Sequence, residues 1–484
     1  MAEEEKKNEG HIVMVPFMAH GHLIPFLALA RLIHQQTSFA ITIANTPLNI
    51  QHLQSAISSS SSSFSNLHLA SLPFEPTSHG LPPNIENAEK IPPSLFPNLG
   101  LAAVSLQPHL RSLISRITEE EGRPPLCVIS DVFLGWVSDV AKSFGSKSIT
   151  FTTCGAYGTF AYMSIWLNLP HRKTDSDEFY VPGFPENYRF HRSQLHRFLR
   201  QANGTDNWSR FFQTQIALSM KSDGWICNTV EEIEPLGLQV LRKFIGSPVW
   251  TIGPLLPTNS GMDSKHRAGK EPGIPLQQCI EWLNLQPERS VLYISFGSQN
   301  SISETQMMSL ALGLEQSGKT FIWVIRPPFG FDMNRDFEAE WLPEGFENRT
   351  KETKRGLLIR NWAPQLEILS HKSVGAFLSH CGWNSVLESL SHGVPIIGWP
   401  LAAEQAYNSK MVEEEMGVGV ELTRTVESVI SGEEVKKVIE RVMERGEGMR
   451  KKASEIAEQI RRAEEENEGS SVRAMHDFVR KVVS

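Results

Sequence analysis

The chain of 484 residues is predicted to be an α/β protein made of two doubly wound, parallel-sheet domains. Three observations favour this fold class. The length exceeds what one ordinary hydrophobic core fills, so two domains are expected. Short apolar runs alternate with helical segments, which is typical of β-α-β units. The alternation stops once, at 254–275, and then starts again.

The first half contains six predicted strands. The first lies at 11–17 and is followed by the helical segment LIPFLALARLIHQQ. The others are predicted at 39–46, 67–74, 126–133, 148–154 and 224–229. Several carry apolar side chains on both faces, as strands covered by helices on both sides do. Together they predict an N-terminal domain at 1–253, interrupted by a loop at the serine tract 58–63.

Residues 254–275 are poor in apolar side chains and rich in Pro, Gly and charge, which predicts a linker. Six further strands are predicted at 291–298, 321–327, 356–362, 374–380, 394–400 and 417–422. They predict a second doubly wound domain at 276–460. Residues 461–484 are expected to form a C-terminal helix that packs back on the first domain.

The composition excludes several classes of protein. With 46 Lys and Arg against 54 Asp and Glu, the net charge is −8, so neither nucleic acid nor an anionic membrane is an expected partner. No run of eighteen apolar residues occurs, and the charged start MAEEEKKNEG is not expected to act as a secretory signal. The five cysteines are scattered and form no C-x-x-C pair, which indicates a reducing compartment. We expect a cytoplasmic protein, by default a monomer.

Two patterns resemble ligand sites but lack the required context. Residues 313–320 match the phosphate-loop pattern G-x-x-x-x-G-K-[ST], which needs a strand before it and a helix after it. Here the order is reversed, so Gly318 is predicted to be a left-handed helix C-cap. Asp175 and Asp177 could bind a divalent cation. They lie beside basic residues with no strand before them, so we predict a solvated loop and no metal.

His22 and Asp131 are the candidate catalytic residues of the first half. The sequence HGH at 20–22 follows a predicted strand and opens a helix. The helix dipole there disfavours a protonated ring, so we expect His22 to be neutral near pH 7 and able to act as a general base. Asp131 ends another strand, and its carboxylate could fix the tautomer of His22 and stabilise the imidazolium. Polar turn residues and a loop-capping aspartate are the structural alternatives.

An anion site is predicted where the strand at 374–380 meets the next helix. His380 ends the strand, and the helix opens with Gly382, Trp383, Asn384 and Ser385. Unpaired backbone N–H groups and the helix dipole attract an anion there, and glycine lets a phosphate approach closely. Ser385 and Glu388 also have the spacing of a capping box, which is the structural alternative.

Three further side chains lie at predicted strand ends on the ligand side of the second sheet. Trp362 offers a flat face for a base, with a place in the hydrophobic core as the alternative. Glu404 and Gln405 follow the strand at 394–400 and could form hydrogen bonds with sugar hydroxyls.

Residues 362–405, WAPQLEILSHKSVGAFLSHCGWNSVLESLSHGVPIIGWPLAAEQ, closely resemble the signature box of the plant secondary-product UDP-glycosyltransferases. The match is dense in Trp, His and Cys, and the rest of the chain is consistent with the family over nearly its full length. The resemblance implies the GT-B architecture, in which two Rossmann-like domains face each other across a cleft and the second holds the donor. It also implies a reaction without a metal.

The resemblance also implies a role for each matching residue on the uridine side. Trp362 stacks on uracil, Ala363 bonds the base through its backbone, and Gln365 lies beside the uridine. Glu388 binds the ribose hydroxyls.

The remaining implied roles concern the diphosphate, the sugar and catalysis. Four residues bind the diphosphate: Ser298 of the YISFGS turn, and His380, Asn384 and Ser385 where Gly382 opens a helix. Four residues contact the sugar: Thr153, Trp383, Glu404 and Gln405. In the first domain, His22 matches the catalytic base and Asp131 matches its partner.

The implied activity is inverting transfer of glucose from UDP-glucose to a hydroxyl group of a small lipophilic acceptor, such as a flavonoid, another phenolic or a terpenoid. No cofactor besides this donor substrate is expected. Gln405 goes mostly with glucose in the family, while Glu404 stands where many members have Asp. His20 stands where Gln is common, and its role is open. Another UDP-sugar (xylose, galactose or rhamnose), a UDP-sugar isomerase and a non-catalytic UDP-sugar binder are the alternatives. The acceptor pocket is expected from the loops at 75–100 and 170–210.

Overall fold

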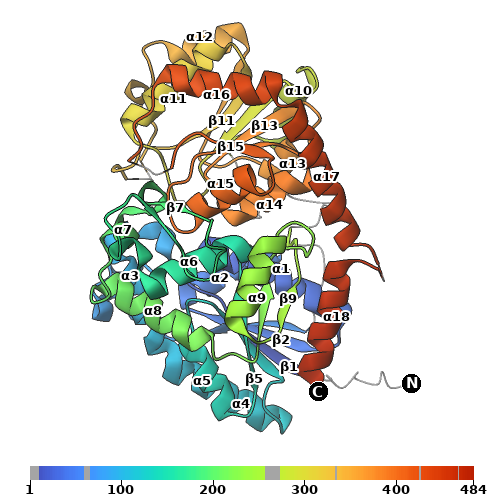
Figure 1. The fold of residues 1–484 in the computed structure, drawn as a ribbon. Coiled ribbons are helices and arrows are strands. Elements are labelled where there is room, and N and C mark those ends of the chain that lie inside the picture. The colour runs from blue at the N-terminus through green and yellow to red at the C-terminus, as the bar shows by residue number, and fades with distance from the viewer. Residues whose placement is uncertain (1–9, 59–65, 257–272, 333–334, 425–426, 467) are drawn as a thin grey trace.

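The computed structural model describes residues 10–58, 66–256, 273–332, 335–424, 427–466 and 468–484. Residues 257–272 of the predicted linker and 59–63 of the serine tract lie outside the described residues. The chain folds into two α/β lobes, one above the other in Figure 1, and each contains one parallel sheet with helices around it. The predicted fold class is confirmed.

The first lobe contains a seven-stranded sheet in the order β3-β2-β1-β4-β5-β8-β9, with all neighbours parallel. Its strands are β1 (His11–Val15), β2 (Ala40–Asn45), β3 (Leu67–Ser71), β4 (Cys127–Asp131), β5 (Lys147–Thr152), β8 (Gly224–Cys227) and β9 (Val249–Thr251). Its helices are α1 (His20–Gln36), α2 (Pro47–Ser58), α3 (Phe96–Ala103), α4 (Gln107–Glu121), α5 (Trp136–Ser143), α6 (Ala156–Asn168), α7 (Arg197–Gln201), α8 (Asn207–Ser219) and α9 (Pro235–Ile245). The central strands β1 and β4 are buried along their whole length, as their continuous apolar sequence predicts.

The second lobe contains a six-stranded parallel sheet in the order β12-β11-β10-β13-β14-β15. Its strands are β10 (Val291–Ser295), β11 (Thr320–Ile325), β12 (Gly356–Arg360), β13 (Val374–Ser379), β14 (Ile396–Gly398) and β15 (Gly419–Glu421). Its helices are α10 (Leu276–Asn284), α11 (Glu304–Ser317), α12 (Phe346–Thr353), α13 (Gln365–Leu369), α14 (Trp383–Ser391), α15 (Gln405–Glu414), α16 (Gly432–Arg445) and α17 (Glu447–Ala463). Both sheets thus reverse their strand order once, which is the topology of a doubly wound fold.

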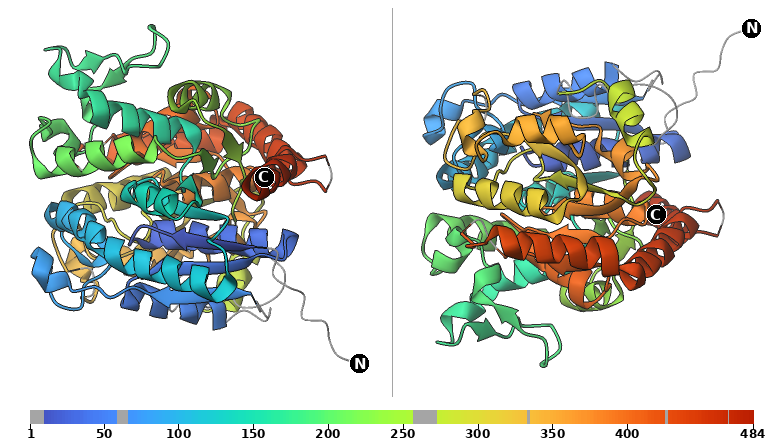
Figure 2. Two further views of the ribbon diagram at one scale, coloured as in Figure 1. Left: turned by 90° about the horizontal axis from the view of Figure 1, so that it is seen from below. Right: turned by 90° about the horizontal axis from the view of Figure 1, so that it is seen from above.

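Each predicted strand segment contains a strand, but three short strands were not predicted. β9 has only three residues, and β6 (Glu178–Phe179) and β7 (Phe190–His191) have two each, too few to show an apolar pattern. β6 and β7 pair antiparallel, and the segment that carries them extends from the body of the molecule in both views of Figure 2.

The phosphate-loop pattern at 313–320 and the pair Asp175 and Asp177 have the structures that their sequence context predicts. α11 ends at Gly318, whose φ of +63° and N–H bond to the carbonyl of Glu315 identify a left-handed C-cap. Asp175 and Asp177 lie in an exposed loop before β6. Among the described residues, no helix is long and apolar enough to cross a membrane.

The C-terminal helices run along one side of both lobes (Figure 1). α18 (Ser470–Val483) packs against β9 of the first lobe. Trp250 donates its indole N–H to Oδ2 of Asp477 at 2.9 Å, and its ring meets that of Phe478 edge-on, with centroids 5.4 Å apart. The end of the chain therefore ties the second lobe to the first.

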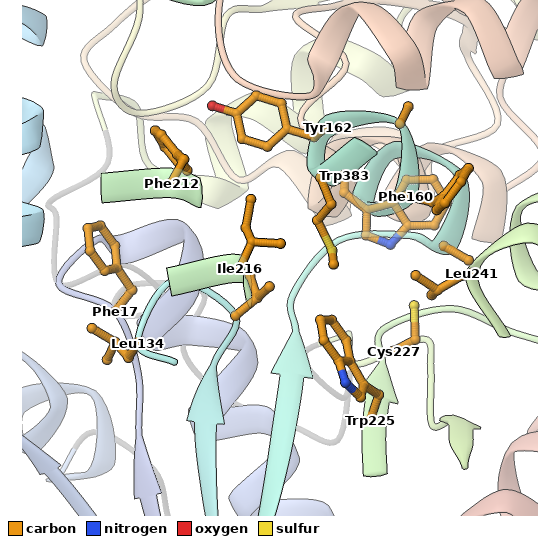
Figure 3. Packing of buried hydrophobic residues seen from close by; sticks show 14 of the residues in the cluster. Phe17, Leu134, Phe160, Tyr162, Phe212, Ile216, Trp225, Cys227, Leu241 and Trp383 are labelled. Atoms are coloured by element: carbon orange, nitrogen blue, oxygen red, sulfur yellow. The ribbon is translucent and has the colours of Figure 1, made fainter. Parts of the chain in front are cut away.

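The two lobes also share a hydrophobic core. Trp383 of α14 and Tyr407 of α15 belong to the same buried cluster as Phe160 and Trp225 of the first lobe. Figure 3 shows Trp383 near Phe160, on the side of the cluster above Trp225. The contact between the lobes is thus partly apolar, which fixes how the two sheets face each other.

Candidate functional site

Four of the predicted site residues lie where the strand order of a sheet reverses. The order reverses between β1 and β4 in the first lobe and between β10 and β13 in the second. Ligands of doubly wound sheets bind at the carboxyl ends of the strands at such points. His22 follows β1 and Asp131 ends β4, while Ser298 and His380 follow β10 and β13.

His22 and Asp131 form a direct hydrogen bond. Nδ1 of His22 lies 2.6 Å from Oδ2 of Asp131, whose side chain is fully buried. The other carboxylate oxygen accepts the backbone N–H of Phe133 at 3.0 Å, so the orientation of the carboxylate is fixed. In the neutral ring this arrangement holds the proton on Nδ1 and leaves the lone pair on Nε2.

The pKa of His22 is raised above its ordinary value, which is opposite to the shift that a helix N-terminus alone would cause. Burial lowers this pKa, but the charge and hydrogen bond of Asp131 and the charge of Glu404 together raise it by more. Both carboxylates favour the protonated ring, because a negative charge near an imidazole stabilises the imidazolium. His22 is therefore a stronger base than a free histidine and needs a higher pH to lose its proton.

Two glycine turns enclose the ring of His380. Gly297 has a φ of +74°, and a Cβ on it would lie 2.4 Å from Nε2 of His380. A Cβ on Gly382 would lie 2.5 Å from the same atom. Only glycine fits at these two positions without a shift of the ring. Gly382 is also the N-cap of α14 and provides no side-chain cap, so the first N–H groups of this helix are available to an anion.

His380 is uncharged at neutral pH. Burial and the charge of Arg326 lower its pKa to about 4, so His380 can offer a diphosphate a hydrogen bond but no charge. Positive charge comes from Arg326, whose Nη1 donates to the backbone oxygen of Ser298 at 2.7 Å. Burial lowers the pKa of Arg326 to about 10 and the charge of Glu89 raises it, so the guanidinium stays protonated at neutral pH.

Gln365 orients the carboxylate of Glu388. Its Nε2 donates to Oε2 of Glu388 at 2.6 Å and to the hydroxyl of Ser385 at 2.9 Å. Its Oε1 accepts the hydroxyl of Tyr293 at 3.1 Å. The capping-box interpretation is wrong, because the N-cap of α14 is Gly382 and Ser385 is the third residue of that helix.

Trp362 and Ala363 lie just beyond β12. Ala363 is buried in a core cluster of the second lobe, whereas the ring of Trp362 is only partly buried and belongs to none of the core clusters of the described residues. The core interpretation of Trp362 therefore does not hold.

Two of the residues expected at the sugar lie near His22. The hydroxyl of Thr153 is 3.5 Å from Nδ1 of His22. Glu404 immediately precedes α15, and its Oε1 accepts Nδ2 of Asn408 at 3.2 Å. Burial raises the pKa of this carboxyl group, while the charge of His22 lowers it. The structure thus brings residues of both lobes together around the imidazole.

The side chains of Gln405 and Trp383, the other two residues expected at the sugar, form hydrogen bonds within the protein. Oε1 of Gln405 accepts the backbone N–H groups of Leu401 and Ala402, at 2.9 Å each, and so shapes the turn before α15. Trp383 is 2% exposed and donates its indole N–H to the carbonyl of Asn228 at 2.6 Å, across the lobe interface. For Trp383, the group left to contact a sugar is the backbone N–H at the start of α14.

Aromatic rings surround His22 within the first lobe. The centroids of Phe17 and Phe133 lie 5.6 and 5.7 Å from that of His22, and Phe133 meets Phe212 edge-on at 5.1 Å. Figure 3 shows Phe17 and Phe212 on the same side of the buried hydrophobic cluster. The side chain of His22 remains 19% exposed.

A stack of nearly parallel rings continues from this cluster. Trp208 lies 4.6 Å from Phe198 and 5.2 Å from Phe96, with interplanar angles of 14° and 10°. Phe212 stacks on Trp166 at 4.7 Å. Phe96 and Phe198 belong to the two loop regions expected to form an acceptor pocket. Rings this close contact one another directly and together form an apolar aromatic wall.

Two residues at the site were not predicted to act there. Arg326 directly follows β11, and a basic residue at the carboxyl end of a parallel strand is a signal that could have identified it. Glu89 accepts the hydroxyl of Ser298 at 2.7 Å, although it belongs to a loop of the other lobe. Nothing in the sequence around Glu89 indicates this contact.

Comparison with known proteins gives consistent matches over both lobes. Residues 8–257 match the family model "Glycosyltransferase, N-terminal domain", and residues 254–453 match "UDP-glucoronosyl and UDP-glucosyl transferase". The chain is 43% identical to UDP-glycosyltransferase 92A1 of Arabidopsis thaliana, over 99% of this chain and 98% of that protein. It is 46% identical to crocetin glucosyltransferase 3 of Crocus sativus, over 95% and 96% of the two chains.

Solved structures show the same architecture. UGT73P12 of Glycyrrhiza uralensis, complexed with glycyrrhetinic acid 3-O-monoglucuronide, superposes with a TM-score of 0.83 at 30% identity, covering 98% of this chain and 95% of that one. UGT71G1 of Medicago truncatula, complexed with UDP-glucose, superposes with a TM-score of 0.80 at 26% identity, covering 99% and 100%.

Proposed function

The chain belongs to the plant family of UDP-glycosyltransferases, which have the GT-B fold, and on that premise we propose that it is an inverting O-glucosyltransferase that uses UDP-glucose. The observation that carries the proposal is the hydrogen bond between His22 and Asp131 at the strand-order reversal of the first sheet. Asn384 of α14 reaches the same place from the other lobe, since its Nδ2 donates to the carbonyl of Gly21 at 3.4 Å.

The proposed reaction is a single displacement. Nε2 of His22 takes the proton of the acceptor hydroxyl while that oxygen attacks the anomeric carbon on the side opposite UDP. The new C–O bond forms as the bond to the β-phosphate oxygen breaks, which gives a β-glucoside and leaves the electron pair on UDP. Asp131 stabilises the imidazolium that results. The N-terminus of α14 and Arg326 stabilise the charge on the leaving UDP, so the proposal includes no metal and no cofactor.

The donor is proposed to lie along the carboxyl edge of the second sheet. Trp362 would stack on uracil, with the backbone of Ala363 and the side chain of Gln365 beside it, and Glu388 would bind the ribose. The diphosphate would be bound by Ser298, His380, Asn384, Ser385 and the turn at Gly382. The sugar would be contacted by Thr153, Glu404, Gln405 and the backbone N–H of Trp383.

UDP-glucose is favoured as the donor because the Medicago relative is complexed with UDP-glucose and the Crocus relative is named a glucosyltransferase. Another donor stays the alternative, since a related structure from Arabidopsis thaliana is complexed with UDP-L-rhamnose.

The acceptor is proposed to be a small, flat, lipophilic molecule with a hydroxyl group. The aromatic rings next to His22, Phe17 and Phe133, support its lipophilic character. Relatives named for scopoletin and flavonoid glucosylation, at 38% and 34% identity, support the same class. We also propose that the enzyme acts in the cytosol as a monomer, a location that suits its five unpaired cysteines.

The test is UDP release by the purified protein with UDP-glucose, in the presence and absence of a panel of phenols and flavonols. We expect release that depends on the acceptor and a product whose anomeric proton shows the β configuration by NMR. Conversion of UDP-glucose without an acceptor would indicate an isomerase instead. No turnover of any UDP-sugar with any acceptor would indicate a binding protein.

A further inference from the structure

Glu89 connects the two lobes beside the turn proposed to bind the donor diphosphate. It lies in a short 3-10 turn (Ala88–Lys90) of the first lobe. Its Oε1 accepts the hydroxyl of Ser298 at 2.7 Å, and its Oε2 lies 2.6 Å from Nδ1 of His20. The Glu89 side chain is 6% exposed, so this carboxylate is largely removed from water.

The loop before Glu89 is anchored to the first lobe. The N–H of Ala88 donates to the carbonyl of Met18 at 2.9 Å. Nδ2 of Asn87 donates to Oδ1 of Asn49 at 2.8 Å, while its Oδ1 accepts the N–H of Glu89 at 3.1 Å. Bonds of its own lobe therefore hold the backbone of the turn, and His20 holds the carboxylate, so the contact with Ser298 is not a chance encounter of a long surface side chain.

We propose that Glu89 is an anion that competes with the donor diphosphate for Ser298 and so weakens the binding of UDP more than that of a UDP-sugar. This inference rests on the proposed function, since it takes Ser298 as a diphosphate ligand. A diphosphate that takes the hydroxyl of Ser298 must displace Glu89 or lie beside it, and two negative groups in contact repel each other. Glu89 also offsets the charge of Arg326, the cation nearest the turn backbone.

The selectivity follows from the charges of the two nucleotides. The terminal phosphate of UDP ionises a second time with a pKa of about 6, whereas the esterified phosphate of a UDP-sugar has no second proton to lose. At neutral pH the product therefore carries one more negative charge than the donor. Repulsion by Glu89 acts more strongly on the product, which favours release of UDP after transfer, when Glu89 can bind Ser298 again.

Titration of UDP into the protein by calorimetry tests this role with four variants. Glu89→Gln removes the charge and keeps the shape, and Ser298→Ala removes the contested hydroxyl and keeps the charge. Glu121→Gln is the matched control, because Glu121 forms a similar pair with His11, at 2.6 Å, where β1 begins, at the opposite end of that strand from the site. Thermal unfolding of each variant checks the fold, and Glu89→Ala provides a second neutral variant.

Glu89→Gln is expected to bind UDP about tenfold more tightly than the wild type and UDP-glucose only about threefold more tightly, the order of magnitude of one repulsive charge next to the diphosphate. Ser298→Ala is expected to bind UDP more weakly, and Glu121→Gln to match the wild type. If the bond between Glu89 and Ser298 only linked the lobes, Glu89→Gln and Ser298→Ala would change the affinity for UDP in the same direction. That result overturns the inference. Unchanged UDP affinity in Glu89→Gln and Glu89→Ala overturns it as well. Failure of the wild type to bind UDP overturns the proposed function, and this inference with it.

Discussion

Replacement of Asp131 by Asn isolates the contribution of one buried charge to catalysis. The side chain keeps its size, but His22 loses a charge-assisted hydrogen bond of 2.6 Å to a fully buried carboxylate. Such bonds contribute about 1.5–3 kcal/mol, and each 1.36 kcal/mol changes a rate tenfold, so loss of imidazolium stabilisation alone predicts a kcat about 10- to 150-fold lower. An amide can also donate to Nδ1 and move the ring proton to Nε2. A triad histidine held in the wrong tautomer loses about 10⁴-fold, which sets the upper limit.

The assay is UDP release at saturating UDP-glucose and acceptor, combined with the affinity for UDP measured by calorimetry. We expect kcat of Asp131→Asn to fall by about 10- to 10⁴-fold while UDP binding stays unchanged. The pH at which kcat/KM rises should also move down, because the charge that raises the pKa of His22 is gone. Asp139→Asn, the same substitution at an exposed position of α5, is the control and should have no effect. A loss below threefold with an unmoved pH profile would refute the role of Asp131.

Three further outcomes are expected. In the wild type, kcat/KM should increase with pH through a pKa above the ordinary value of 6.5, because the pKa of His22 is raised and only the unprotonated ring accepts a proton. A pH profile of kcat/KM with its midpoint below 6 would contradict this. Gly297→Ala should lower the free energy of unfolding by about 2–4 kcal/mol in denaturant and weaken UDP binding, because the added Cβ meets the ring of His380. The control is Gly122→Ala, since Gly122 also has a positive φ, +70°, but no atom near the position of the added Cβ. It should cost only about 1–2 kcal/mol. Phe478→Ala in α18 should lower the stability by about 3–5 kcal/mol without a change in UDP affinity, and a large loss of affinity would show that α18 shapes the site.

The strands could be predicted because most of them are buried on both faces. β1, β4 and β13 have no polar face to show alternation, but their continuous apolar runs between helical segments identify a parallel sheet. The rule that ligands bind at the carboxyl ends of strands then located His22 and Asp131, which lie in contact although they are far apart in the sequence. β9 was missed because three residues carry no pattern.

The electrostatics of the site could not be predicted in the same way. The helix dipole at His22 is a local property of the sequence, whereas the charges of Asp131 and Glu404, which raise its pKa, come from elements that meet only in the folded protein. The bond of Glu89 to Ser298 likewise depends on how the two lobes pack together. The side chain of Trp383 is buried for the same reason, although the start of its helix was predicted correctly.

The central claim is that His22 accepts the proton of the acceptor while the other lobe holds the donor. It is tested most directly by the comparison of kcat with UDP affinity in His22→Ala. The account predicts a fall in kcat of about 10²–10⁴-fold with an unchanged Kd for UDP, because general base catalysis is lost while the donor site of the second lobe stays intact. Equal losses of kcat and UDP affinity, or a variant as active as the wild type, would contradict it.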